Sequence, residues 1–161
     1  MNTAEKQALA EQAYQKALRY ELDYGCCPQC VLAVVQETVG IVDNNIIKAS
    51  HGLSGGGGLM GQGACGALSG GLMALSAKFG RERHKLDAGR GINNFKKSRE
   101  LVERFRQEFG GVTCEELQKK FTGRTYNMWN AEEYKAFDKA RGNQCAHATA
   151  TVTKWLIEIL D

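Results

Sequence analysis

Hydrophobic residues recur every three or four positions along most of this chain, which is the spacing that places them on one face of an α-helix. The first such stretch covers residues 3–22. Its apolar positions are Ala10, Ala13, Tyr14, Ala17, Leu18 and Leu22. Gly25 follows this stretch and favours an end to the helix. We therefore predict an N-terminal amphipathic helix within residues 1–25.

The same periodicity predicts the rest of the fold. Helices are expected at residues 28–39, 43–49, 65–79, 92–109, 113–121, 132–140 and 144–160. Asp43 and Thr113 are residue types that cap helix N-termini, and Glu116 stands three positions after Thr113, as in a capping box. Strand-like alternation is weak throughout. The sequence thus predicts one all-α domain over residues 1–161, a bundle of about seven or eight helices.

A glycine-rich stretch interrupts this pattern at residues 52–63, with the sequence GLSGGGGLMGQG. Because glycine is too flexible for a regular element here, we predict a loop. Gly61 to Gly66 match the letters of a dinucleotide-binding motif, but no strand precedes them, so that function is disfavoured. Gly66, Ser69 and Gly70 share one flank of the next predicted helix, where another backbone or a cofactor can approach closely.

Composition and charge narrow the class of protein. The net charge is +3, and no apolar run approaches the roughly 18 residues of a membrane span. The polar N-terminus lacks the apolar core of a signal peptide, so we expect a cytoplasmic protein with no membrane span. Residues 78–106 hold ten Lys or Arg and four Asp or Glu. We interpret them mainly as a solvated face, with docking to an acidic protein as the alternative, and expect no nucleic-acid partner.

Six cysteines are the main chemical signal: Cys26, Cys27, Cys30, Cys65, Cys114 and Cys145. Cytosolic thiols are normally kept reduced, so this number indicates metal ligation or redox chemistry rather than disulfides. Cys27, Cys65, Cys114 and Cys145 all fall at predicted helix N-termini, where unpaired N–H groups favour the thiolate. Cys27 and Cys30 also form a C-x-x-C pair, the arrangement of many thiol–disulfide proteins.

The order of these cysteines resembles a known family. The chain contains in order Cys27, the run Gly63-Ala64-Cys65-Gly66-Ala67-Leu68-Ser69-Gly70, then Phe109-Gly110 with Cys114-x-x-Leu117, and finally Cys145. This order is similar to that of the C_GCAxxG_C_C family of redox-active proteins. That family looks related to part of the split-Soret cytochromes, dimeric electron carriers that hold haem and an iron–sulfur centre. The resemblance implies a helical fold, four cysteines able to ligate a cluster, and the homodimer as one arrangement.

Two departures from the family pattern leave a choice open. The order here is Ala64-Cys65-Gly66-Ala67 rather than Gly-Cys-Ala, and Cys26 and Cys30 flank Cys27. The N-terminal ligand is therefore one of Cys26, Cys27 and Cys30.

Our leading hypothesis is an iron–sulfur cluster held by Cys27, Cys65, Cys114 and Cys145, serving electron transfer or redox sensing with a redox partner protein. Gly63, Gly66 and Gly70 are its expected backbone neighbours. The alternative is a cluster-free dithiol in which Cys27 attacks and Cys30 resolves. A third hypothesis is a structural zinc site with four cysteine ligands, which the spacing suits less well. The sequence names no substrate and leaves open whether the protein is an enzyme.

Overall fold

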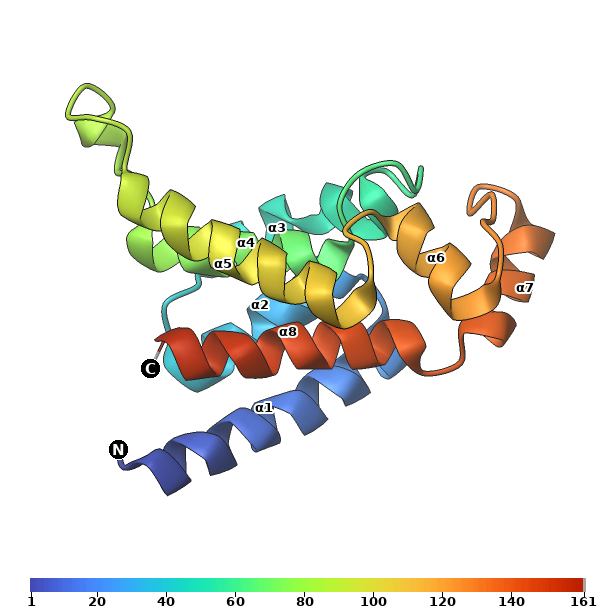
Figure 1. The fold of residues 1–161 in the computed structure, drawn as a ribbon, viewed down its shortest axis with the longest axis horizontal. Helices are drawn as coiled ribbons and strands as arrows, with labels where there is room; N and C mark the ends of the chain where they lie inside the picture. The colour runs from blue at the N-terminus through green and yellow to red at the C-terminus, as the bar shows by residue number, and fades with distance from the viewer. Residues whose placement is uncertain (161) are drawn as a thin grey trace.

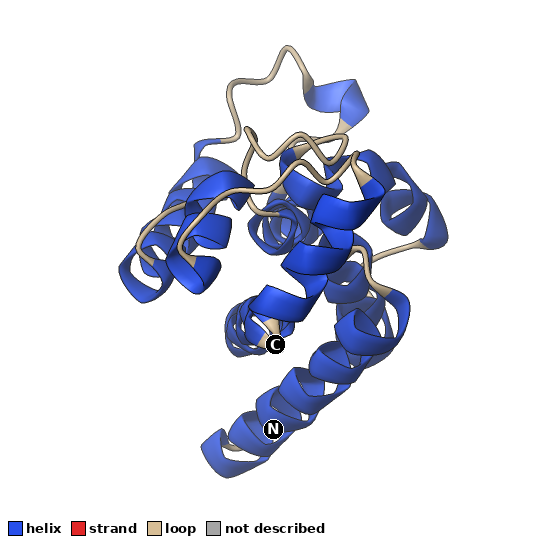
Figure 2. Ribbon diagram, turned by 90° about the vertical axis from the view of Figure 1, so that its right-hand side faces the viewer, coloured by secondary structure: helices blue, strands red, loops and turns tan. Residues whose placement is uncertain are grey.

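The computed structural model describes residues 1–160 and shows eight α-helices and two short 3-10 helices in that range (Figure 1). No strand is formed by these residues, and loops connect the helices (Figure 2). The elements are α1 (Thr3–Tyr24), α2 (Cys27–Val39), α3 (Asn44–Ala49), η1 (His51–Gly56), α4 (Gly66–Phe79), η2 (Arg83–Lys85), α5 (Ile92–Phe109), α6 (Cys114–Thr122), α7 (Ala131–Arg141) and α8 (Gln144–Leu160). The predicted all-α bundle is confirmed.

Local signals in the sequence fix several helix ends. Asp43 accepts a hydrogen bond from the Ile46 N–H at 3.0 Å, and Thr113 accepts one from the Glu116 N–H at 3.2 Å. Both predicted caps are thus confirmed. Gly40 and Gly110 follow the last residues of α2 and α5 with positive φ, the conformation that satisfies the final carbonyls of a helix.

The glycine stretch is more regular than predicted. Its first residues belong to η1 instead of a continuous loop, because the Leu53 N–H donates to the Ser50 carbonyl three positions earlier. Ser54, with a ψ of 145°, and Gly55, with a φ of 61°, form a kink inside this element, which ends at Gly56. The irregular segment is therefore shorter than the 52–63 range expected from composition.

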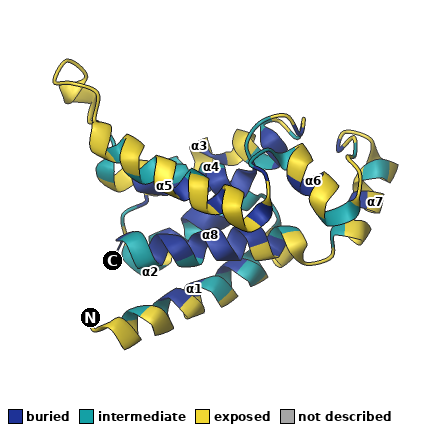
Figure 3. Ribbon diagram, in the orientation of Figure 1, coloured by how far each residue is buried: buried dark blue, intermediate teal, exposed yellow. Residues whose placement is uncertain are grey.

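The core lies around α8, which packs on α1, α2 and α4 (Figure 3). Val152, Leu156 and Ile157 of α8 are fully buried. Gly71 of α4 lets that helix approach closely, since a Cβ there would lie 2.8 Å from a Val152 methyl group. Burying each large aliphatic side chain stabilises the fold by about 1.5–3 kcal/mol.

The chain termini and the N-termini of α2 and α8 lie at opposite ends of the molecule. α1 and α8 run antiparallel, and both chain termini lie at one end (Figure 1). The N-termini of α2 and α8 lie toward the opposite end, near α6 and α7. Within residues 1–160, no helix is both long enough and apolar enough to cross a membrane.

Candidate functional site

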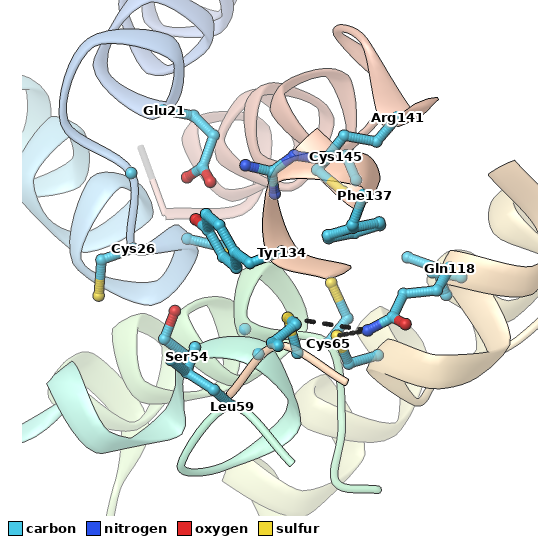
Figure 4. Close-up of a pocket in the computed structure, with 18 residues that line it drawn as sticks. Glu21, Cys26, Ser54, Leu59, Cys65, Gln118, Tyr134, Phe137, Arg141 and Cys145 are labelled. Atoms are coloured by element: carbon cyan, nitrogen blue, oxygen red, sulfur yellow. Dashed lines mark hydrogen bonds between the residues drawn. The ribbon is translucent and has the colours of Figure 1, made fainter. Parts of the chain in front are cut away.

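Five cysteines line one cavity at the end of the bundle away from the termini, Cys26 and four that stand at the starts of four different helices (Figure 1 and Figure 4). Cys27 is the first residue of α2, Cys65 is the N-cap of α4, Cys114 is the first residue of α6, and Cys145 is the second residue of α8. All four therefore stand at helix N-termini, as the sequence predicts. We call this space the cysteine cavity.

Cys65 and Cys114 are held beside each other by backbone pairing. The Cys65 N–H donates to the Val112 carbonyl at 2.7 Å, and the Cys114 N–H donates to the Gly63 carbonyl at 3.0 Å. Together with an isolated bridge between Ala64 and Thr113, these bonds tie the end of the glycine stretch to the start of α6. Two cysteines that are 49 positions apart in sequence are thereby fixed in one wall.

Glycine is required where this stretch folds back on itself. A Cβ on Gly63 would lie 2.4 Å from the Gly56 carbonyl oxygen, and one on Gly56 would lie 2.9 Å from the Cys114 Cβ. Gly56 also has a φ of 79°, which side-chain-bearing residues rarely adopt. The glycines thus allow backbone to pack directly against backbone beside Cys114.

Gly66 and Gly70 likewise allow α4 to pack closely against α2. A Cβ on Gly66 would lie 2.8 Å from the Pro28 Cδ and 3.1 Å from the Cys27 sulfur, and one on Gly70 would lie 2.9 Å from the Pro28 backbone. Of the three glycines predicted to neighbour a cofactor, Gly66 lines the cysteine cavity, whereas Gly63 and Gly70 contact protein backbone.

Cys26 and Cys30 occupy different positions from Cys27. Cys30 is buried, donates to the Gly25 carbonyl at 3.0 Å, and lines a second pocket with Tyr20 and His51. Cys26 lines both the second pocket and the cysteine cavity. Its φ of 65° is unusual for a residue other than glycine. The two halves of the C-x-x-C pair therefore line different spaces.

The cavity wall also contains polar residues that were not predicted from the sequence, among them Glu21, Gln118 and Arg141. The buried Gln118 donates to the Cys114 sulfur at 3.4 Å and to the Met128 sulfur at 3.8 Å (Figure 4). Among the described residues, Glu21 and Arg141 are the only charged side chains that line this cavity.

Arg141 is held in place by its own helix. Its guanidinium donates to the Asp138 carboxylate at 2.6 Å and lies 4.9 Å from the centre of the Phe137 ring. The same group lies beside Cys145 (Figure 4). The positive charge of Arg141 lowers the pKa of the Cys145 thiol and so opposes the effect of burial.

Each of these positions left a signal in the sequence. Glu21 continues the spacing of Ala10, Ala13 and Ala17 and so places a carboxylate on the buried face of α1. Gln118 lies four residues after Cys114, and Arg141 lies four residues before Cys145. One helical turn brings Gln118 onto the same side of α6 as Cys114. Arg141 ends α7 and Cys145 belongs to α8, so the turn between these helices brings the second pair together.

Burial dominates the protonation of the cavity thiols. It raises the pKa of Cys27 far above its usual value, that of Cys65 to about 12, and that of Cys145 to about 11, where Arg141 opposes it. Burial also raises the pKa of Cys114, against Gln118 and Arg141. The expectation that helix N-termini would lower these pKa values was therefore wrong, because desolvation of the buried thiols outweighs the helix ends.

Glu21 is a further ionisable group of the cavity, and burial raises its pKa as well. Thr149 donates to its carboxylate at 3.4 Å. Nowhere in residues 1–160 do three His, Cys, Asp or Glu side chains stand close enough to hold a single metal ion.

Comparison with known proteins identifies a family. The family described as "Putative redox-active protein (C_GCAxxG_C_C)" matches residues 25–159, a range that includes Cys27, Cys65, Cys114 and Cys145. Neither the curated proteins nor the solved structures gave a match. The chain belongs to the C_GCAxxG_C_C family of redox-active proteins.

Proposed function

We propose that this chain holds an iron–sulfur cluster through Cys27, Cys65, Cys114 and Cys145 and uses it for electron transfer or redox sensing. The observation that carries the proposal is that these four thiols, from four helices, line one cavity. Cysteine thiolates are the ligands that such clusters use. Sulfur atoms spread over a cavity wall suit a centre of several atoms better than a single ion.

The surroundings of the thiols support an anionic centre. Four helix N-termini direct their partial positive charge toward it, and Arg141 adds a full positive charge. A buried neutral thiol loses its proton when its sulfur binds a metal cation, so binding of the cluster would release protons.

When bound, a cluster supplies reversible one-electron chemistry. Gln118 would donate a hydrogen bond to a ligand sulfur, which favours the more negatively charged, reduced state. Arg141 would act in the same direction and Glu21 in the opposite one. Leu117, Met128 and Phe137 would limit the access of water to the centre.

The dithiol alternative has weaker support. Cys27 and Cys30 line different spaces, and burial raises the pKa of both thiols. Because the thiolate is the nucleophile, both are expected to react slowly in disulfide exchange. A structural zinc site with the same four ligands suits the donor set chemically and is distinguished by metal content.

The test is purification without oxygen, followed by a visible spectrum and measurement of iron and acid-labile sulfide. We expect brown protein that bleaches in air or with chelator. Cys65→Ser and Cys145→Ser should remove the colour. Cys30→Ser is the matched control and should keep it, since Cys30 does not line the cysteine cavity.

Two results would contradict the proposal. Colourless anaerobic protein whose thiol titre falls by two on mild oxidation, but not in Cys30→Ser, would favour the dithiol. Colourless protein with one tightly bound zinc would favour the structural site.

The proposal also requires a redox partner protein that donates or accepts the electron. We further propose a homodimer in the cytoplasm, from the kinship with split-Soret cytochromes and the reduced state that free thiols keep there. Gel filtration of the loaded protein tests the dimer.

A further inference from the structure

The connection between α4 and α5, together with the first turns of α5, projects from the body of the molecule (Figure 1). We call residues 81–99 the basic arm. Every residue from 81 to 93 is exposed. Two hydrogen bonds from the Arg81 guanidinium hold its loop together, one to the Leu86 carbonyl at 3.1 Å and one to the Gly89 carbonyl at 2.7 Å.

The charge of the chain is divided unevenly between this arm and the rest. The arm contains seven Lys or Arg and two acidic residues, whereas the other residues contain 14 Lys or Arg and 16 acidic residues. Among the described residues, no acid pairs with Arg83, Lys85, Arg90 or Lys96, and the one ion pair of the arm is Arg99 with Glu103. The arm is therefore a concentration of uncompensated positive charge.

Large apolar side chains stand among these charges. Leu86 is 48% exposed, Ile92 is 60% exposed and Phe95 is 56% exposed. Phe95 also lines a surface hollow with Arg81 and Arg90. Cations beside exposed apolar side chains fit a surface that offers both phosphates and hydrocarbon.

The arm is remote from the cysteine cavity. Cys65 caps one end of α4 and the arm begins just beyond the other end, so the 14 residues of that helix separate them. At 1.5 Å per residue this is about 21 Å. A partner on the arm would not touch the cavity thiols, which favours an anchoring surface over a site of electron exchange.

We propose that the basic arm binds anionic membrane surfaces. Its cations contact lipid phosphates, and Leu86, Ile92 and Phe95 enter the headgroup region. The exposed apolar side chains favour a membrane over nucleic acid, whose backbone offers them no apolar contact. The proposal is independent of any bound cofactor.

The test measures binding of the full chain to sedimented vesicles. Vesicles of phosphatidylcholine mixed with phosphatidylglycerol should bind at low salt, and pure phosphatidylcholine vesicles should not. Arg90→Gln with Lys96→Gln removes two unpaired charges and should weaken binding roughly thirty-fold. Phe95→Ser should also weaken it, because an apolar contact is lost.

The matched control is Lys119→Gln with Lys135→Gln, which removes two exposed charges outside the arm and should leave binding unchanged. Helical dichroism of each variant checks that it folds. Absence of binding to anionic vesicles at low salt would overturn the proposal, as would binding that the arm variants leave intact. Tighter binding to duplex DNA than to vesicles, lost in the arm variants, would assign the arm to nucleic acid instead.

Discussion

At the scale of single residues, the two charges of the cysteine cavity have opposite effects on a negative centre. Arg141 lies beside Cys145, and Glu21 approaches the thiols from α1 (Figure 4). Because both line the cavity, each is desolvated and acts at short range. Their substitution therefore gives separate predictions.

Arg141→Gln should lower the midpoint potential of the loaded protein by several tens of millivolts, since the reduced centre loses a nearby positive charge. Arg141→Lys should keep most of the potential. Lys139→Gln, an exposed position on the same helix that does not line the cavity, is the control. Redox titration followed by visible absorbance measures the shift, and equal potentials in all three variants would show that Arg141 does not act on the centre.

Glu21→Gln should stabilise the metal-free protein at neutral pH. Burial raises the pKa of Glu21 in the folded state, so folded protein binds more protons than unfolded protein between the two pKa values. Stability is therefore lost as pH rises through the folded pKa, with a slope of at most about 1.4 kcal/mol per pH unit.

Urea unfolding at several pH values checks this sign. The gain from Glu21→Gln should vanish below the unfolded pKa of a glutamate, where both states are protonated. Glu100→Gln, an exposed acid, should show no such pH dependence. A wild-type stability that rises with pH while the variant's stays flat would contradict the prediction.

At the scale of elements, the contact between α2 and α4 sets the position of Cys27. Gly70→Ala would push a methyl group to within 2.9 Å of the Pro28 backbone, which cannot move aside as a side chain can. We expect a loss of about 1–3 kcal/mol in the free energy of unfolding. Gly52→Ala is the control, since no atom lies within 4 Å of its added Cβ and its φ is not positive. Equal losses of unfolding free energy in both variants would mean that the absence of a side chain at Gly70 is not needed for the contact between α2 and α4.

The elements themselves were largely predictable from sequence, because their signals are local. The apolar periodicity predicted the bounds of α5 and α8 as the structure has them. The start of η1 was missed because glycine content says how freely a chain bends and not which hydrogen bonds it makes. Local signals also placed four cysteines at helix starts.

The cavity wall was less predictable, because it depends on which helices meet. Glu21, Gln118 and Arg141 come from α1, α6 and α7, and the spacing of a residue within one helix does not say that these helices meet around one cavity. The rise in thiol pKa was missed for the same reason. Helix position is visible in sequence, whereas burial is a property of the assembled fold.

At the scale of the whole molecule, the four cysteines lie on helices that differ in how extensively they pack against the rest of the protein. α8 packs against three long helices, whereas the main neighbours of α6 are α7 and η1. Cys114 belongs to this peripheral pair of helices, and Cys27, Cys65 and Cys145 belong to the core helices or their N-caps. A centre bound by all four would therefore join α6 to the body.

Hydrogen exchange should show this connection as a difference between metal-free and loaded protein. In the metal-free protein, amides of α6 and α7 should exchange much faster than those of α8, because few buried contacts protect them. Loading should slow exchange in α6 and α7, since a ligand that binds only the closed arrangement stabilises it. The middle of α8 should change little and is the internal control. Slowing of similar size in every helix would mean that the centre stabilises the fold as a whole, and unchanged exchange in α6 would mean that Cys114 is not among its ligands.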